Sequence, residues 1–332
     1  MAITMESIKT LRAMTGAGLA DVKKALTEAD GDMDRAKEIL RERGQAIAAK
    51  RSDRETSNGC VLVKSANGFS AIIALKCETD FVANGADYIK LTQEILDAAV
   101  AAKAKSIDEV NNLTLANGQT VAAAVTERSG VTGEKMELDG YLYLEGENVS
   151  CYNHMNKNSL CTMVQTNKPA EEQAHIVAMQ VAAMKPVALS EADVDPKIIE
   201  EEKTVAREKT KQEQVQKAVD NALKKAGINP AHVDSEDHME SNMAKGWITA
   251  EDVAKAKEII ATVSAEKAAS LPAQMVENIA KGRVAKFLKE NCLVDQEFQF
   301  GDGDKATVAQ WLSAQDKELK VVAFQRFSLV AD

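Results

Sequence analysis

The stretch that decides the fold is Thr79-Asp80-Phe81-Val82-Ala83-Asn84, because it joins a strand-like segment to a helix-like one. Before it, residues 70–76 read Ser-Ala-Ile-Ile-Ala-Leu-Lys, a short apolar run typical of a buried strand. After it, apolar residues recur at helical spacing: Tyr88, Leu91, Ile95 and Leu96. Thr79 or Asp80 is therefore expected to cap a helix. The pair Phe81-Val82 either staples that helix to its sheet or forms a contact site.

A hairpin followed by a helix is expected twice. The first copy has strands at residues 59–64 and 71–75, joined by a turn at Ala66-Asn67-Gly68 and followed by an alanine-rich helix. The second copy has these segments: 141–144, 149–154, 160–164 and a helix at 171–184. The copies agree in order but not in identity. We therefore expect an α+β fold with two related antiparallel-sheet-plus-helix halves, and two unrelated α+β pieces are the alternative.

Glycines divide the first part of the chain into three short helical segments, which indicates a compact module. This module resembles ubiquitin-associated domains, which are three-helix protein-binding units. The expected organisation of the chain is a ubiquitin-associated-like module at 1–55, a first α+β half at 56–138, a second half at 139–199 and 270–332, and a helical insertion at 200–269.

The insertion is rich in Glu, Lys, Ala and Gln, with apolar stripes typical of two helices. The stripes are Val205, Val215, Val219 and Leu223, then Val253, Ile259, Ile260 and Val263. They predict an exposed helical hairpin. The next helix is opened by Leu271-Pro272, and its stripe at Met275, Ile279, Phe287 and Leu288 is expected to cover the second sheet. A last strand is expected at 319–329.

Composition limits the possible function classes. The formal net charge of −10 argues against a general nucleic-acid binder, which needs concentrated Lys and Arg. The start of the chain has no charged segment followed by an apolar stretch, and no run is long enough to cross a bilayer. We therefore expect a cytoplasmic protein without a membrane partner. Five cysteines without a Cys-x-x-Cys pair predict neither a disulfide nor a zinc site.

An enzyme would need a phosphate cradle, a nucleophile or an acid–base pair. The phosphate-binding patterns Gly-x-x-x-x-Gly-Lys-Ser/Thr and Gly-x-Gly-x-x-Gly do not occur, so we expect no direct nucleotide binding and no cofactor. His232 and His238 bracket Asp234, which is compatible with a metal site, but a polar, solvated loop is the preferred interpretation. The sequence therefore predicts neither a bound metal nor an enzyme.

Three segments resemble signatures of the elongation factor Ts family. The first is Leu75-Lys76-Cys77-Glu78-Thr79-Asp80-Phe81-Val82-Ala83. The second lies upstream of the first and extends from Leu11-Arg12 through Thr15-Gly16-Ala17-Gly18. The third is Ile279-Ala280-Lys281-Gly282-Arg283. Their order is that of the family. The chain departs from the family at Cys77, where asparagine is common, and in the length of its insertion.

The resemblance implies a guanine nucleotide exchange factor that binds elongation factor Tu–GDP and promotes GDP release by displacing Mg²⁺ in that partner. Phe81 would insert between helices of the partner's GTP-binding domain. Thr79 and Asp80 would contact the displaced segment, and Val82 would brace the wedge. The second half would contact the partner's β-barrel regions, and Tyr152 and His154 match residues of the family there.

A second contact region is implied in the three-helix module. Leu11, Arg12, Thr15 and Gly16 would lie near the partner's GTP-binding domain, and turn formation and core packing are the alternative role for these residues. Residues 41–54 are the only strongly basic stretch. We interpret it as a tether facing acidic residues of a protein partner. An RNA-binding protein that uses this stretch is the competing hypothesis, weakened by the small number of aromatic residues for base stacking.

Overall fold

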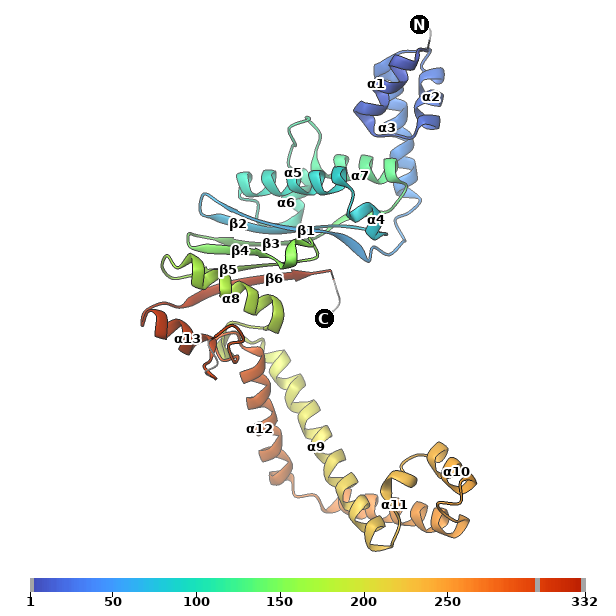
Figure 1. Cartoon of the computed structure of the whole chain (residues 1–332), viewed down its shortest axis with the longest axis vertical. Coiled ribbons are helices and arrows are strands. Elements are labelled where there is room, and N and C mark those ends of the chain that lie inside the picture. Colours follow the sequence, from blue (N-terminus) through green and yellow to red (C-terminus); the bar gives the residue numbers. More distant parts are fainter. Residues whose placement is uncertain (1–2, 302–304, 330–332) are drawn as a thin grey trace. The chain divides into compact units, whose positions relative to one another are not determined.

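The computed structural model describes residues 3–301 and 305–329, and the chain divides into two compact units. The first unit comprises Met1–Leu189 and Glu297–Asp332, and the second comprises Ser190–Gln296. The first contains the helical module and all six strands of the described residues (Figure 1). The limits predicted inside the first unit, near residues 55 and 138, stay a prediction.

The three predicted N-terminal helices are present as α1 (Met5–Thr15), α2 (Leu19–Glu28) and α3 (Met33–Ala49). Local sequence sets their ends. Thr4 and Asp32 cap α1 and α3 with their side chains. Gly16 ends α1 at φ +68°, a left-handed conformation that glycine adopts without a steric penalty. The buried faces enclose a small core of Leu11, Val22, Leu26, Ala36 and Ile39.

The first sheet consists of β1 (Asn58–Ala66), β2 (Phe69–Cys77) and β3 (Met136–Glu145), in the antiparallel order β1-β2-β3. Asn67 and Gly68 form the predicted hairpin turn with positive φ at both residues. The helices on its outer face are α5 (Ala86–Ala102), α6 (Ile107–Asn112) and α7 (Val121–Thr132). The one-turn helix α4 (Asp80–Ala83) joins β2 to α5.

The second sheet consists of β4 (Val149–Asn153), β5 (Leu160–Thr166) and β6 (Val321–Ser328), in the antiparallel order β4-β5-β6. Helix α8 (Glu171–Met184) packs on its outer face, and α13 (Val308–Gln315) precedes β6. Each sheet thus combines a hairpin, a helix and a later third strand. The predicted α+β class, with antiparallel sheets and an N-terminal helical module, is confirmed.

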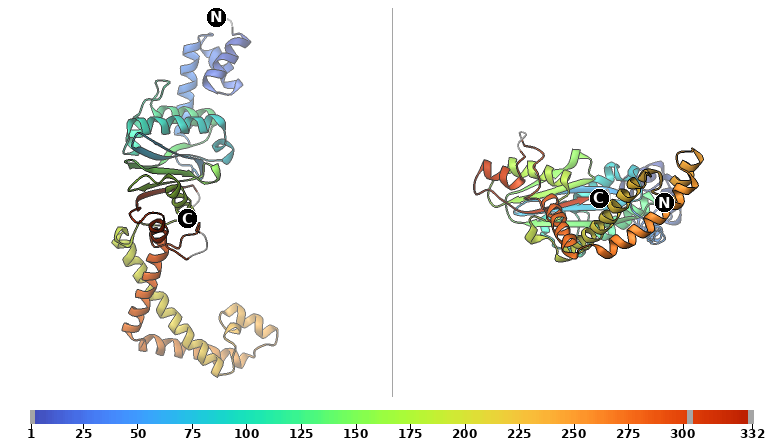
Figure 2. Two further views of the ribbon diagram at one scale, coloured as in Figure 1. Left: turned by 60° about the vertical axis from the view of Figure 1, so that its left-hand side comes forward. Right: turned by 90° about the horizontal axis from the view of Figure 1, so that it is seen from below.

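The two sheets pack face to face between their helices (Figures 1 and 2). Strand β2 shows the consequence, because its side chains alternate between two cores. Ala71, Ile73 and Leu75 pack with the helices, whereas Ile72 and Ala74 pack with Cys161 and Met163 of β5. Both faces of β2 are therefore buried, which explains its continuous apolar run in place of an alternating one.

One strand assignment from the sequence was wrong. Residues 141–144 were expected in the second half, but they lie in β3 and pair with β2, with Tyr143 opposite Ala71. Alternation indicates that a segment is a strand but does not identify its pairing partner. The short distance along the chain between residues 144 and 149 favoured placing both segments in the same half. Helices α5, α6 and α7 instead carry the chain back to the first sheet.

The second unit is helical, with α9 (Pro196–Lys225), α10 (Glu236–Ala244), α11 (Ala250–Ser270) and α12 (Ala273–Asn291). Helices α9 and α11 correspond to the predicted hairpin. The stretch from His232 to His238 was predicted to be a solvated loop, and this was wrong, because residues 230–248 include regular helical structure. They form a 3-10 turn and α10, and Val233, Met239 and Ile248 are buried with Val219 and Leu223 of α9. The insertion therefore has a hydrophobic core of its own. Further 3-10 turns lie at His154–Asn156 and Glu191–Asp193.

Helix α12 also differs from expectation. Its buried residues are Val276, Ala280, Val284 and Leu288, a stripe that shares only Leu288 with the predicted one. It packs along α9, and Arg207 on α9 bonds Glu277 on α12 at 2.8 Å between Nε and Oε2. The helix belongs to the second unit and the second sheet to the first, so neither the predicted stripe nor the assignment of this helix to the second half was right. Within residues 3–301 and 305–329, no helix combines the length and apolar character needed to cross a membrane.

Candidate functional site

Phe81 lies on α4, the single helical turn that follows β2. Its side chain is 86% exposed, more than any other large apolar side chain in the described part of the chain. Its neighbours are anchored: Ala83 is buried in the core of the first half, and Val82 packs against that core. Thr79 caps the turn, because its Oγ1 accepts a bond from the Val82 N–H at 3.3 Å. The turn thus holds the phenyl ring in solvent on a fixed base.

Glu134, just after α7, fixes the backbone that leads into this turn. Its Oε2 accepts the backbone N–H groups of Glu78 at 3.2 Å and Thr79 at 3.1 Å. The Thr79 hydroxyl donates to its Oε1 at 2.6 Å. Bonds to a charged acceptor are stronger than bonds between neutral groups. One carboxylate therefore ties the end of β2 to the end of α7.

Glu78 completes the brace in the opposite direction. Its Oε1 accepts the backbone N–H of Lys135 at 2.6 Å, and its Oε2 accepts a bond from Arg54 Nη1 at 3.0 Å. The bond from the Lys135 N–H, with a contribution from the Arg54 guanidinium, holds the pKa of the Glu78 carboxyl below its usual value. Glu78 is therefore ionised near neutral pH. The segments around residues 78 and 134 hold each other through reciprocal carboxylate-to-backbone bonds.

Two buried side chains support the turn from below. The Cys77 thiol donates to the Thr79 carbonyl at 3.2 Å, and the Tyr88 hydroxyl donates to the Leu75 carbonyl at 2.7 Å. Burial raises the pKa of Cys77, so this thiol stays protonated and remains a donor. Cys77 therefore supplies a hydrogen-bond donor directly beneath the turn.

The residues predicted in the three-helix module divide into support and surface. Leu11 is fully buried, so it acts through the module core. Thr15 donates its hydroxyl to the Leu11 carbonyl at 2.7 Å, and the Gly16 N–H donates to the Arg12 carbonyl at 2.8 Å. These three residues build the turn after α1, as the packing alternative implies. Arg12 is exposed, and the neighbouring Met14 is 59% exposed, so these two side chains form the accessible surface.

The structure places the two predicted groups on different elements. Thr79, Asp80, Phe81 and Val82 lie together on or beside α4, whereas the N-terminal group lies at the end of α1. Asp80 is exposed on the same turn as Phe81. A carboxylate and an aromatic ring thus protrude together from the strand-to-helix junction.

Comparison with known proteins decides the family. A family model described as Elongation factor TS matches residues 78–226 and 213–331. The chain is 66% identical to Elongation factor Ts of Bacteroides fragilis and 64% identical to that of Parabacteroides distasonis, over the full length of both chains in each case. It is 40% identical, again over full lengths, to Elongation factor Ts of Porphyromonas gingivalis. The chain belongs to the elongation factor Ts family. The resemblance expected from the three signatures is therefore confirmed.

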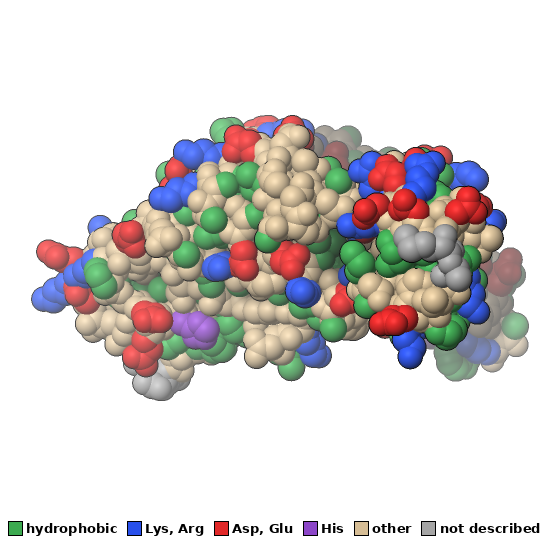
Figure 3. Space-filling view, turned by 90° about the horizontal axis from the view of Figure 1, so that it is seen from above, with side chains coloured by type: hydrophobic (Ala, Val, Ile, Leu, Met, Phe, Trp, Pro, Cys, Tyr) green, Lys and Arg blue, Asp and Glu red, His purple; other side chains and the backbone are tan. Residues whose placement is uncertain are grey.

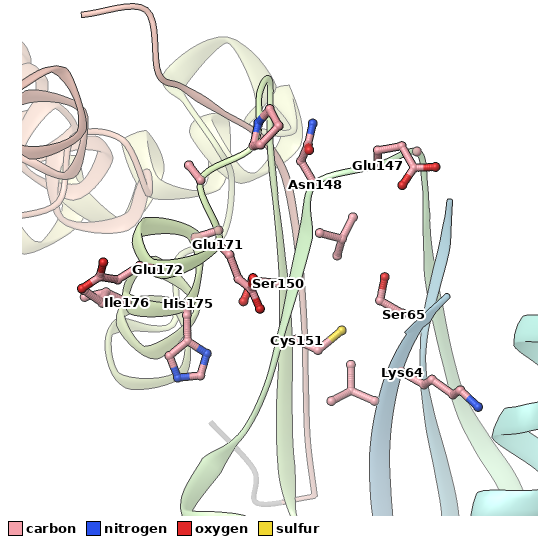
Figure 4. Close-up of a pocket in the computed structure, with 16 residues that line it drawn as sticks. Lys64, Ser65, Glu147, Asn148, Ser150, Cys151, Glu171, Glu172, His175 and Ile176 are labelled. Atoms are coloured by element: carbon pink, nitrogen blue, oxygen red, sulfur yellow. The ribbon is translucent and has the colours of Figure 1, made fainter. Parts of the chain in front are cut away.

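In this family member, an open cavity of about 1090 Å³ lies between β1 of the predicted first half and β4 and the start of α8 of the predicted second half (Figure 4). Lys64 comes from β1, Cys151 from β4, and Glu171 and His175 from α8. Tyr152, also on β4, packs edge-on to His175 at 5.5 Å between ring centroids. Its hydroxyl lies 3.1 Å from His154 Nδ1. Partner contacts from this half stay a prediction.

Three arginines of the basic stretch form ion pairs within the chain. Arg41 pairs with Glu38 at 2.7 Å, and Arg43 pairs with Glu28 at 2.5 Å. Arg54 pairs with Glu78. These three arginines thus lie beside acidic residues of the chain itself, and the interpretation of the stretch as a tether facing acidic residues of a partner stays a prediction. On the face shown in Figure 3, positive and negative side chains are interspersed, which gives no support to an RNA-binding surface there.

Sequence reasoning missed Glu78 and Glu134 as residues of this site. Glu78 lies inside the signature at 75–83, but nothing in the local pattern indicates where its carboxylate points. Glu134 lies outside all three signature segments. Its contact with Thr79 joins positions far apart in the sequence, so periodicity and capping patterns contain no signal for it. Pairwise covariation between the two positions could have revealed it.

Proposed function

We propose that this member of the elongation factor Ts family is a guanine nucleotide exchange factor that works in the cytoplasm. It binds elongation factor Tu–GDP and promotes GDP release, which supports translation elongation. One observation carries the proposal: the Phe81 ring is exposed on a turn that Glu134 and Thr79 hold in place. Large apolar side chains that protrude singly from a fixed base are suited to enter a partner's pocket.

The proposed mechanism needs no catalytic side chain in this chain, so the protein is not an enzyme. Exchange follows from linkage between binding events on elongation factor Tu. If binding of this protein lowers the affinity of elongation factor Tu for GDP and Mg²⁺, these ligands lower its affinity for this protein by the same factor. Phe81 inserts between helices of the GTP-binding domain and separates the region that holds Mg²⁺. Asp80 and Thr79 contact the displaced segment. Loss of the cation then removes the positive charge that holds the diphosphate.

The free energies agree with this role. Each tenfold loss of GDP affinity requires about 1.4 kcal/mol of differential contact. Burying a phenylalanine side chain contributes roughly 2 to 3 kcal/mol. Burial of Phe81 alone could therefore supply the free energy for a 10- to 100-fold loss of GDP affinity. Because the turn is already braced, little conformational freedom of its backbone is lost when the partner binds, so most of this free energy is available for weakening GDP.

Stopped-flow release of fluorescent GDP from purified elongation factor Tu tests the proposal. We expect the wild-type protein to accelerate release and Phe81→Ala to lose roughly 10- to 100-fold of the acceleration, the factor that burial of one phenyl ring provides. Trp247→Ala is the matched control, because Trp247 is an exposed aromatic residue of the second unit. This variant should accelerate GDP release from elongation factor Tu as strongly as the wild-type protein does.

The outcomes separate function from mechanism. If neither the wild type nor the variants accelerate GDP release, the exchange function is wrong. If the wild type and Phe81→Ala accelerate release equally, the function stands and the wedge is wrong. Equal losses in Phe81→Ala and Trp247→Ala would indicate a general effect of removing an exposed ring.

A further inference from the structure

Helices α3 and α7 cross at a pair of glycines. A Cβ placed on Gly130 of α7 would lie 2.2 Å from Gly44 Cα and 2.8 Å from the Gly44 carbonyl carbon. Those are backbone atoms, which cannot rotate away as a side chain can. The reverse substitution meets more space, because a Cβ on Gly44 would lie 3.4 Å from Gly130 Cα. The crossing therefore requires glycine at 130 more strictly than at 44.

Two further contacts join the three-helix module to α7. A Cβ on Gly16, in the turn after α1, would lie 3.6 Å from Val131 Cγ1 and 3.8 Å from Arg128 Nη1. At the other end of the module, the Arg51 guanidinium lies over Gly133, 3.5 Å from the position of a Cβ there. The turn that contains the N-terminal signature and the end of α3 thus both rest on the last turns of α7.

The same end of α7 holds the wedge. Glu134 is one helical turn beyond Gly130, and it binds the backbone N–H groups of Glu78 and Thr79. Arg54, which follows α3, bonds Glu78 at 3.0 Å. Residues 128–134 therefore position two surfaces at once: the exposed side of α1 with Arg12, and the turn with Phe81.

We propose that Gly130 is a positioning residue, which fixes the three-helix module relative to the Phe81 turn so that elongation factor Tu is bound at two points by one rigid body. The inference rests on the exchange function proposed above and extends it to a residue that does not itself touch the partner. Once one of the two surfaces has bound elongation factor Tu, the other is held near its own binding site at a high effective concentration. A loosely tethered module would lower this effective concentration and so weaken binding. Gly130 therefore determines affinity, and Phe81 determines the rate of release from the complex.

Single alanine variants test the crossing. The readout is the concentration of this protein that gives half-maximal GDP release, together with the maximal release rate. Gly130→Ala should raise that concentration roughly tenfold by loss of effective concentration and leave the maximal rate within about twofold of wild type. Gly44→Ala should have a smaller effect, because its Cβ has more room. Gly282→Ala, on α12, meets nothing within 4 Å and is the matched helical glycine control, so it should behave like the wild type.

A double-mutant cycle separates positioning from general damage. In the wild-type background, Arg12→Ala should raise the half-maximal concentration roughly fivefold, and in the Gly130→Ala background by less than about twofold, since the second contact point is no longer held in place. Phe81→Ala should reduce the maximal rate by the same factor in both backgrounds. Loss of stability alone would not change the effect of Arg12→Ala selectively.

Val131→Ser is a second variant in case Gly130→Ala does not fold, because it weakens the contact with the Gly16 turn without adding an atom at the crossing. Circular dichroism establishes that each variant is folded. Equal half-maximal concentrations for wild type, Gly130→Ala and Val131→Ser would overturn the inference, and so would an effect of Arg12→Ala that is absent or identical in the two backgrounds. Absence of exchange by the wild type would instead overturn the proposed function, and this inference with it.

Discussion

Glu78 lies one residue before the cap of α4, and its carboxylate accepts bonds from the Lys135 backbone N–H and from Arg54. These donors favour the ionised form, so the pKa of Glu78 is lower in the folded protein than in the unfolded chain. A depressed carboxyl pKa contributes stability that is fully present above the unfolded pKa. That contribution is lost as the pH falls through the folded pKa.

This sign gives a pH prediction for Glu78→Gln. The free energy of unfolding of wild type should exceed that of the variant by a constant amount above about pH 5.5, and the difference should shrink as the pH falls below the ordinary carboxyl value of 4.5. Urea unfolding at a series of pH values measures it. Other carboxyl groups titrate in both proteins and cancel. A difference that persists unchanged down to about pH 3 would contradict the role of ionised Glu78.

At the scale of elements, α4 is a single turn, and single turns do not form stably by themselves in water. Its stability comes from three external supports: the Thr79 cap, the burial of Ala83 and the bonds to Glu134 after α7. The exposed ring is therefore positioned by an element distant in sequence.

Glu134→Gln tests this dependence. The amide has one acceptor oxygen in place of two, and its NH₂ group faces donors, so we expect a loss of about 1 to 3 kcal/mol in the free energy of unfolding. GDP release should also slow although Phe81 is intact. Glu94→Gln on α5, whose Lys90 partner is 3.8 Å away on an exposed face, should change stability by no more than about 0.5 kcal/mol. Urea midpoints and stopped-flow rates give both readouts. Unchanged release by Glu134→Gln would show that the wedge needs no such brace.

At the scale of the whole molecule, the chain has two compact units with separate hydrophobic cores. The second unit's core includes Leu223, Met239 and Ile248, none of which belongs to the cores of the sheets. The chain has two tryptophans, Trp311 in the first unit and Trp247 in the second, so each unit has one fluorescent reporter. Unfolding of the two units can therefore be followed separately.

Met239→Ala should destabilise the second unit alone, by about 2 to 5 kcal/mol, because it removes a side chain that is 6% exposed from a small core. In a Trp311→Phe background, fluorescence reports Trp247 and should show an earlier urea transition. In a Trp247→Phe background, the Trp311 transition should not move. If both transitions moved together, the two units would unfold as one cooperative system.

Local signals predicted the parts of the fold that depend on neighbouring residues. Gly16, the turn at Asn67-Gly68 and the Thr79 cap each fix the backbone within a few positions, and each is where the sequence indicated. The exposure of Phe81 could not be predicted, because either face of a one-turn helix can meet the core. Only the burial of Ala83 and the packing of the partly buried Val82 against the core decide it.

Features that rest on distant contacts escaped prediction. The pairing of β3 with β2 depends on the helices between them, and α10 has too polar a sequence to reveal a buried face until Leu223 of α9 covers it. The brace by Glu134 and the crossing at Gly130 each join segments that no sequence window spans together. In physical terms, periodicity reports which face of an element is buried, but not what buries it.

The pairing of β5 with β6 has a consequence for the speed of folding. Leu160 pairs with Ser328, and the whole second unit lies between these strands, whereas β1 and β2 are closed by a two-residue turn. Contacts between residues distant in sequence form slowly, because the chain must lose much conformational entropy before any stabilising contact forms. We therefore expect the second sheet to be completed last. If the second unit folds first, the flexible chain between β5 and β6 becomes shorter, and closing the loop between them costs less conformational entropy. The second unit, which separates these strands in the sequence, would then also help to bring them together.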